Sequence, residues 1–334
     1  MDMNAWVADT IAAEKKQALP VLSFPAIQKM GITVKELIAS ADKQAEAMKV
    51  IADEFPTAAA VSFMDLSIEA EAFGSQIVVS DEEVPTVVGS IVGEDSDPDE
   101  LAVPEVGAGR TGLAVEAIAQ VTKEISDRPV LAGIIGPFSL AGRLMDVNEI
   151  MLLCYDEPEL VKAVLDKCTA FLTSYARAFK DSGADGVVMA EPLAGLLAPD
   201  LLAEFSTPYV NKIVDEIQTD EFIVVYHNCG SSVVKAAESI VSTGARAFHF
   251  GNAIKMADIL PLMPSDVLVM GNVDPAGELR MGTPESVREA TLSVLRECSS
   301  WPNFIISSGC DVPPMAPFEN IHAFFDAVDE FYAD

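Results

Sequence analysis

The sequence contains few basic residues and few histidines. Lysine and arginine total 21 of 334 residues against 52 aspartates and glutamates, the formal net charge is −31, and no arginine precedes Arg110. Nucleic acids and anionic membrane surfaces bind stripes of lysine and arginine, so we expect neither as a partner. Five cysteines are too few for a disulfide framework in a chain of this length, and a cysteine with special spacing is more simply a metal ligand or a nucleophile.

Long uninterrupted apolar stretches are also missing. The first twenty residues mix acids and lysines into an amphipathic pattern, without the apolar core and cleavage site of an export signal. The most apolar stretch, residues 129–142, is short and broken by glycine and proline, so it cannot span a bilayer. We therefore expect a cytoplasmic protein with no membrane segment.

Short β-rich apolar runs, each ending in polar residues, glycine or proline, alternate with helical stretches. Continuous apolar runs are typical of strands covered on both faces, and their alternation with helices indicates parallel βαβ units. There are eight such runs, at 20–25, 58–65, 129–137, 186–192, 222–230, 245–252, 267–275 and 304–310. Eight units predict a (β/α)8 TIM barrel. A doubly wound open sheet is the alternative.

One segment, residues 76–110, does not fit this alternation, and we interpret it as a β-hairpin insertion after the second strand. No linker divides the chain, so residues 1–334 are expected to form a single domain. The "GAGRTG" at 107–112 has the G-x-G-x-x-G spacing, but it follows no buried strand and does not predict a nucleotide site.

Two candidate metal ligands end the fifth predicted strand, "FIVVYHNCG". His227 and Cys229 are two residues apart, so in an extended chain their side chains point to the same face. Cys310 ends the eighth strand in "SSGCDVPP", and a barrel brings the carboxyl ends of its strands to one mouth. One nitrogen and two sulfurs with a fourth position open is the pattern of a catalytic zinc site.

Four more polar residues end predicted strands. Asp65 and Asp274 are candidate catalytic residues that could bind substrate, or else cap turns. His249 either lines the pocket, as a candidate for cofactor binding, or packs in the core. Glu191 is a candidate for a weak, displaceable fourth metal ligand. The remaining cysteines and the last histidine lie in helical stretches and are expected to be structural: Cys154, Cys168, Cys298 and His322.

Several motifs resemble the uroporphyrinogen decarboxylase superfamily, and specifically its methyltransferase branch, the zinc-dependent methylcobamide:coenzyme M methyltransferases. The resemblance runs from about Phe24 to Phe331. Its motifs are "IGPFSLAG" at 135–142, "HNCG" at 227–230, "GNVDP" at 271–275 and "SSGCDVPP" at 307–314.

The resemblance implies zinc on His227, Cys229 and Cys310, and methyl transfer from a methylated corrinoid protein to a zinc-bound thiolate. A free thiol has a pKa of about 8.5, and coordination to a cation removes its proton while leaving the sulfur able to attack. Coenzyme M, homocysteine or another small thiol is the expected acceptor.

Two alternative functions compete with methyl transfer. A porphyrinogen decarboxylase of the same superfamily must bind many substrate carboxylates, and the authentic enzymes use an arginine-rich segment near the N-terminus, which this chain lacks before Arg110. A barrel that binds metal or corrinoid without catalysis is the second alternative.

Overall fold

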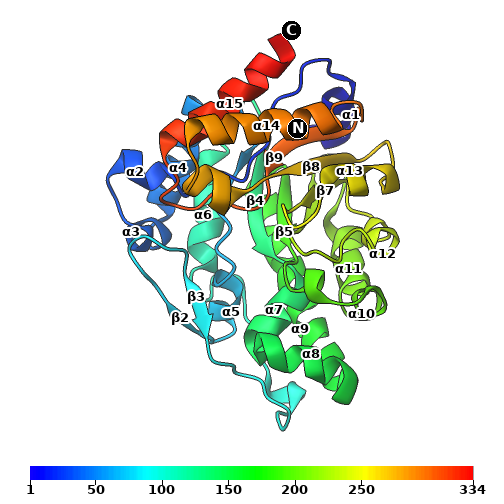
Figure 1. The fold of residues 1–334 in the computed structure, drawn as a ribbon. Coiled ribbons are helices and arrows are strands. Elements are labelled where there is room, and N and C mark those ends of the chain that lie inside the picture. Colours follow the sequence, from blue (N-terminus) through cyan, green and yellow to red (C-terminus); the bar gives the residue numbers. More distant parts are fainter. Residues whose placement is uncertain (334) are drawn as a thin grey trace.

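The computed structural model describes residues 1–333, which form an α/β fold around a curled parallel sheet (Figure 1). The sheet has seven strands in the order β1-β4-β5-β6-β7-β8-β9, and every neighbouring pair is parallel. The strands are β1 Ala60–Val61, β4 Val130–Ile135, β5 Gly186–Ala190, β6 Ile223–Asn228, β7 Ala247–Phe250, β8 Leu268–Val273 and β9 Phe304–Ser308.

Helices separate the strands in the chain and cover the outer face of the sheet. The α-helices are α1 Met3–Ala12, α2 Ala26–Met30, α3 Val34–Ile38, α4 Ala41–Glu54, α5 Ile68–Ala72, α6 Thr111–Val121, α7 Pro137–Met145, α8 Val147–Asp156, α9 Pro158–Asp181, α10 Pro199–Phe205, α11 Thr207–Ile217, α12 Ala237–Val241, α13 Met256–Ile259, α14 Pro284–Cys298 and α15 Phe318–Ala333. Short 3-10 turns are η1 Pro98–Glu100, η2 Ala194–Leu196 and η3 Leu260–Leu262, and η4 Pro275–Arg280 is a π-helix.

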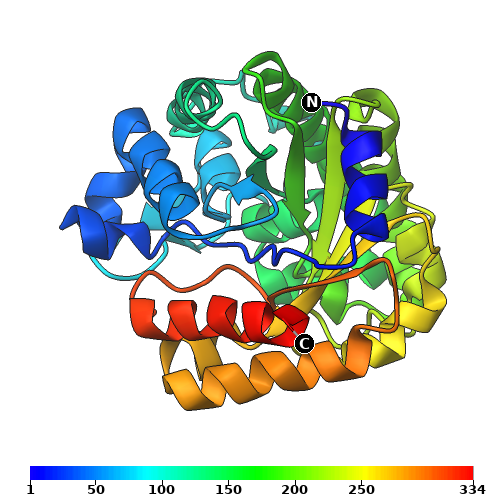
Figure 2. The ribbon, with the colours of Figure 1, turned by 90° about the horizontal axis from the view of Figure 1, so that it is seen from above.

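The prediction of eight strands was wrong in one place, because residues 20–25 are not a strand. The segment nevertheless lies between the two edge strands of the sheet (Figure 2). Val21 N donates to Ser308 Oγ of β9 at 3.1 Å, and Ser23 Oγ donates to Val61 O of β1 at 2.5 Å. Prolines at both ends of the predicted run lack an N–H, so a regular ladder cannot form there. The other seven predicted strands each contain one observed strand.

Side chains on each strand alternate between two apolar cores. The larger core joins the outward-facing strand residues to the helices. The smaller core lies on the face that the curl encloses, with α1 packed on it, and includes Leu131, Val188, Val225, Ala247 and Ile305. The apolar residues of the smaller core therefore show which side chains of each strand face inward. Every second residue further along the same strand faces inward as well.

Residues 76–110 leave the main sheet. Within them β2 Gln76–Val78 pairs antiparallel with β3 Thr86–Val88, and both strands are largely exposed. The pair lies beside α5, away from the parallel strands (Figure 1). No helix among residues 1–333 combines the length and apolar composition that crossing a membrane requires.

Candidate functional site

The inward row of side chains becomes polar at the carboxyl ends of three strands. On β6 it passes from Val225 to His227, on β7 from Ala247 to His249, and on β9 from Ile305 to Ser307. His227 and His249 are register partners on neighbouring strands. Strand parity and register together therefore place both histidines on the enclosed face, where they touch.

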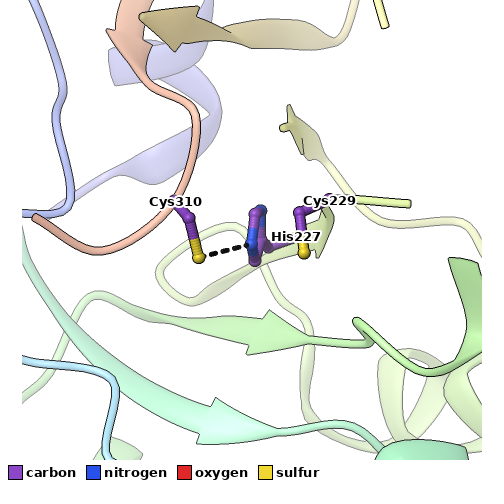
Figure 3. A group of neighbouring side chains, drawn as sticks. All are labelled: His227, Cys229 and Cys310. Atoms are coloured by element: carbon purple, nitrogen blue, oxygen red, sulfur yellow. Dashed lines mark hydrogen bonds between the residues drawn. The ribbon is translucent and has the colours of Figure 1, made fainter. Parts of the chain in front are cut away.

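Three potential metal ligands converge at this end of the sheet (Figure 3). One ligand atom each from His227, Cys229 and Cys310 lie within 4.8 Å of one another, and Cys310 Sγ is 3.5 Å from His227 Nε2. Zinc–sulfur and zinc–nitrogen bonds of about 2.3 and 2.0–2.1 Å in a tetrahedron separate S and N by about 3.6 Å. The donor set and the 3.5 Å spacing of Cys310 Sγ and His227 Nε2 therefore fit zinc.

The pKa values of the two cysteine thiols in this group are shifted in opposite directions. The Cys310 thiol, followed by the His227 ring, lowers the pKa of Cys229 to about 4, whereas the neighbouring Cys229 raises the pKa of Cys310 well above its ordinary value. One proton is thus shared by two sulfurs, and one of them is a thiolate at neutral pH. Thiolate is the form that binds metal.

His249 fixes the tautomer of His227. Its Nε2 lies 2.8 Å from the carbonyl oxygen of Ser308, which can only accept, so Nε2 carries the hydrogen. Burial, then the neighbouring His227, lowers the pKa of His249 well below its ordinary value, so the ring is neutral and its Nδ1 accepts. It lies 2.6 Å from Nδ1 of His227, which also lies 3.2 Å from the carbonyl oxygen of His249, so both contacts require His227 Nδ1 to donate. The lone pair of His227 Nε2 is left facing Cys310.

Cys229 packs directly against the backbone that follows β7. A Cβ built at Gly251 would lie 2.5 Å from Cys229 Cβ and 2.6 Å from its Cα. Only glycine allows this approach without a shift of one loop. Gly251 therefore helps to place the Cys229 sulfur near His227.

Glu191 lies outside the group of three ligands. Its side chain is fully buried, and its carboxylate accepts from Phe138 N and Ser139 N at 2.9 Å and from Ser139 Oγ at 2.7 Å. These donors belong to the first turn of α7, where negative charge is favourable. Burial raises the pKa of Glu191 to about 7 against the effect of these hydrogen bonds. The structure thus places the carboxylate at a helix N-terminus rather than with the cysteines.

Asp65 forms a buried ion pair. Its Oδ1 accepts from Ser67 N at 3.0 Å and from Ser67 Oγ at 2.6 Å, and its Oδ2 pairs with Arg110. Arg110 Nε also donates to Glu71 at 2.6 Å. Both oxygens of Asp65 are thus occupied, which matches the expectation of a turn residue more closely than that of a substrate ligand.

Asp274 and His322 also have local partners, and the remaining cysteines are buried. Asp274 Oδ1 accepts from the backbone N–H of Ala276 and Gly277, both at 2.9 Å, so it caps η4. His322 in α15 pairs with Glu54 at 3.0 Å. Three cysteines are buried in helices, as expected for packing residues: Cys154, Cys168 and Cys298.

Two residues of this region were missed from the sequence. Asp311 is half-buried beside Cys310, accepts from Met64 N at 2.7 Å, and has its pKa raised to about 8 by burial of the carboxyl group. Its position in the turn that holds Cys310 could have identified it. Arg143 faces a cavity near Met64, but an arginine within a helical pattern gives no such signal.

Comparisons with known proteins agree with the motifs. The uroporphyrinogen decarboxylase (URO-D) family model matches residues 12–331. The chain is 29% identical over 271 residues to the methylcobamide:CoM methyltransferase MtbA of Methanosarcina acetivorans, covering 80% of this chain and 78% of the relative. It is 25% identical over 307 residues to a uroporphyrinogen decarboxylase of Alcanivorax borkumensis, covering 88% and 85%.

The fold has a close counterpart among solved structures. A methyltransferase from Methanosarcina mazei superimposes with a TM-score of 0.86 over 99% of both chains, at 22% identity. The family match covers nearly the whole chain and includes each motif quoted above. The chain therefore belongs to the uroporphyrinogen decarboxylase family, as its motifs predicted.

Proposed function

We propose that this protein is a zinc-dependent methyltransferase that moves a methyl group from a methylated corrinoid, carried by a partner protein, to a small thiol. The observation that carries the proposal is the convergence of one nitrogen and two sulfurs at the enclosed end of the sheet. Its support from relatives is the similarity to the methylcobamide:CoM methyltransferases.

The residues of the chain have separate parts in this proposal. His227, Cys229 and Cys310 would hold zinc and leave a fourth position for the thiol. Zinc bound there would lower the pKa of the thiol, so that its sulfur is a thiolate at neutral pH. His249 orients His227 through the pair of Nδ1 atoms, and Glu191 holds the start of α7.

The reaction balances as a transfer of a methyl cation equivalent. The cobalt–carbon bond of the donor breaks and leaves both electrons on cobalt, while a lone pair of the thiolate sulfur forms the new sulfur–carbon bond. The thiol proton passes to solvent when the thiol binds. Two cysteine thiolates in the site would keep electron density on the acceptor sulfur, which favours its attack on carbon.

The decarboxylase alternative has less support. A substrate with many carboxylates needs several free cations, yet the chain has no arginine before Arg110, and within residues 1–333 only Arg143 and Arg246 among the arginines form no ion pair. Arg110 itself is neutralised by Asp65 and Glu71. Moreover, decarboxylation gives no role to two cysteines and a histidine that fit a metal.

The proposal is tested with free methylcobalamin in place of the corrinoid protein. Zinc-loaded protein is incubated with methylcobalamin and 2-mercaptoethanesulfonate, homocysteine or 2-mercaptoethanol, while the methylcobalamin absorbance is followed and the methylated thiol is identified by mass spectrometry. We expect zinc-dependent methylation of at least one thiol, abolished in Cys310→Ala. No methylation of any thiol by zinc-loaded protein, together with formation of coproporphyrinogen from uroporphyrinogen, would establish the decarboxylase instead.

A further inference from the structure

Arg143 has no acidic partner in a protein where acids outnumber bases. Six of the eight arginines form an ion pair, whereas within residues 1–333 Arg143 and Arg246 form none. Arg246 precedes β7, at the opposite end of the sheet from His227. Arg143 lies in the last turn of α7 and is partly buried. A partly buried arginine without a counter-ion is costly unless something else neutralises it.

Arg143 borders a cavity of about 230 Å³. The opposite walls are formed by the loop after β1, including Met64 and Ser67, and by residues 84–87 of the β2–β3 segment. Most of these walls are apolar, and burial lowers the pKa of Arg143 without neutralising it. The cavity is therefore a small, mostly apolar space with one cationic group.

None of the three ligands lines the cavity, but one backbone contact connects it to the turn that holds Cys310. Met64, which lines it, donates its N–H to Asp311 at 2.7 Å, and Asp311 follows Cys310 directly. A volume of about 230 Å³ accommodates a small thiol but neither a corrin ring nor a porphyrinogen. A molecule lying there with one end toward the cysteines has its other end available to Arg143.

We propose that Arg143 binds the anionic end of the acceptor thiol, a sulfonate or a carboxylate, while the sulfur reaches the cysteine side. This assignment rests on the proposed function and specifies its substrate class as an anionic thiol. A guanidinium offers two parallel N–H donors to either anion. The bound anion would in turn neutralise the positive charge of Arg143, which has no acidic partner in the cavity wall.

The test uses thiols that differ only at the far end. Methyl transfer from methylcobalamin is measured with 2-mercaptoethanesulfonate, 3-mercaptopropionate and the neutral 2-mercaptoethanol, for wild type, Arg143→Gln and Arg143→Lys. Arg177→Gln is the control, because Arg177 lies on α9 and pairs with Glu216 at an exposed site. The two anionic thiols separate sulfonate from carboxylate recognition.

We expect Arg143→Gln to lower kcat/KM for the preferred anionic thiol by about 10- to 100-fold through KM, the range for a lost charge-assisted hydrogen bond. Arg143→Lys should recover part of this loss, and both variants should lose much less activity with 2-mercaptoethanol, which has no anionic group. Equal losses for charged and neutral thiols, or no loss for the charged ones, would overturn the assignment.

A binding measurement separates this proposal from the proposed function. Ethanesulfonate has no thiol, so its binding to wild type and Arg143→Gln by calorimetry tests the cavity even if no thiol is methylated. Should Arg143→Gln not fold, protection of Arg143 in the wild type from an arginine-specific dicarbonyl reagent, mapped by mass spectrometry, gives the same information. Ethanesulfonate that binds wild type and variant equally, or that fails to protect Arg143, contradicts the proposal.

Discussion

Nδ1 of His249 lies 2.6 Å from Nδ1 of His227. The contact follows from the register of β6 and β7, in which these residues are direct partners. Because the Ser308 carbonyl holds the hydrogen of His249 on Nε2, Nδ1 of the same ring is left to accept from His227. The lone pair of His227 Nε2 is thus directed toward Cys310, as the proposed zinc site requires.

This chain of contacts predicts how His249 variants bind zinc. His249→Leu removes the nearer acceptor of His227 Nδ1 and leaves only the backbone carbonyl of residue 249, at 3.2 Å, so zinc affinity should fall by about 10-fold, the lower end of the effect of losing a group that orients a ligand. His249→Asn, whose amide oxygen replaces Nδ1, should retain part of the affinity. Competition with a chromophoric chelator measures both. Equal affinity in wild type and His249→Leu would show that the pair does not orient His227.

The ligand set itself predicts zinc content. Protein purified without chelator should contain about one zinc per chain, and Cys229→Ala or Cys310→Ala should lose nearly all of it, because two remaining ligands do not hold the ion. Cys154→Ala is the matched control, since that thiol is buried in α8. Elemental analysis decides, and full zinc in both ligand variants would refute the site.

The close approach of Gly251 to Cys229 predicts that a larger residue at position 251 weakens zinc binding. A methyl group there would lie 2.5 Å from Cys229 Cβ, so Gly251→Ala must displace one loop and move the sulfur. We expect weaker zinc binding and a lower melting temperature. Gly93→Ala is the control, because a Cβ at Gly93 meets nothing within 4 Å. Equal zinc affinity in the two variants would show that the loop after β7 yields without cost.

Much of the site was readable from the sequence because it obeys strand periodicity. His227 and Cys229 share a parity that the apolar residues of β6 already define, and the parallel fold brings Cys310 to the same end. Residues 20–25 were misassigned as a strand because their apolar content outweighed the prolines at both ends, which lack the N–H donors that a ladder needs.

Partners of charged side chains could not be read in the same way. Asp65 pairs with Arg110, 45 residues later, and Glu191 reaches the first turn of α7, 52 residues earlier. Such contacts depend on how loops and helix ends meet in space, and no local pattern encodes them. Arg143 is similar, because its lack of a partner appears only once all neighbours are placed.

The Asp65–Arg110 pair predicts a large stability effect. Its carboxylate is fully buried and the arginine is 12% exposed, so Asp65→Asn leaves a buried positive charge that only Glu71 compensates. The free energy of unfolding should fall by about 3–5 kcal/mol. The exposed pair of Arg177 and Glu216 is the control, and Glu216→Gln should cost less than about 1 kcal/mol. Denaturant titration of both variants measures the difference.

Glu69 predicts how stability depends on pH. Its side chain is buried, Oε1 accepts from Ile135 N at 2.9 Å, and Oε2 has no hydrogen-bond partner within residues 1–333. Burial, reinforced by the nearby Asp65 charge, raises the pKa of Glu69 to about 7 from an ordinary value of 4.5. Between these two values the folded protein holds a proton that the unfolded chain has released.

Unfolding therefore releases this proton, and the contribution of Glu69 to stability falls as pH rises from about 4.5 to 7, then levels off. Glu69→Gln mimics the protonated form, so its free energy of unfolding relative to wild type should increase across this window, by on the order of 3 kcal/mol in total. The exposed Glu116→Gln should give a flat difference. Glu191 and Asp311 are present in all three proteins, so their titration largely cancels when the free energy of unfolding of a variant is compared with that of wild type. A flat difference for Glu69→Gln as well, measured by urea unfolding at pH 5, 6, 7 and 8, would show that Glu69 is ionised in the folded protein throughout.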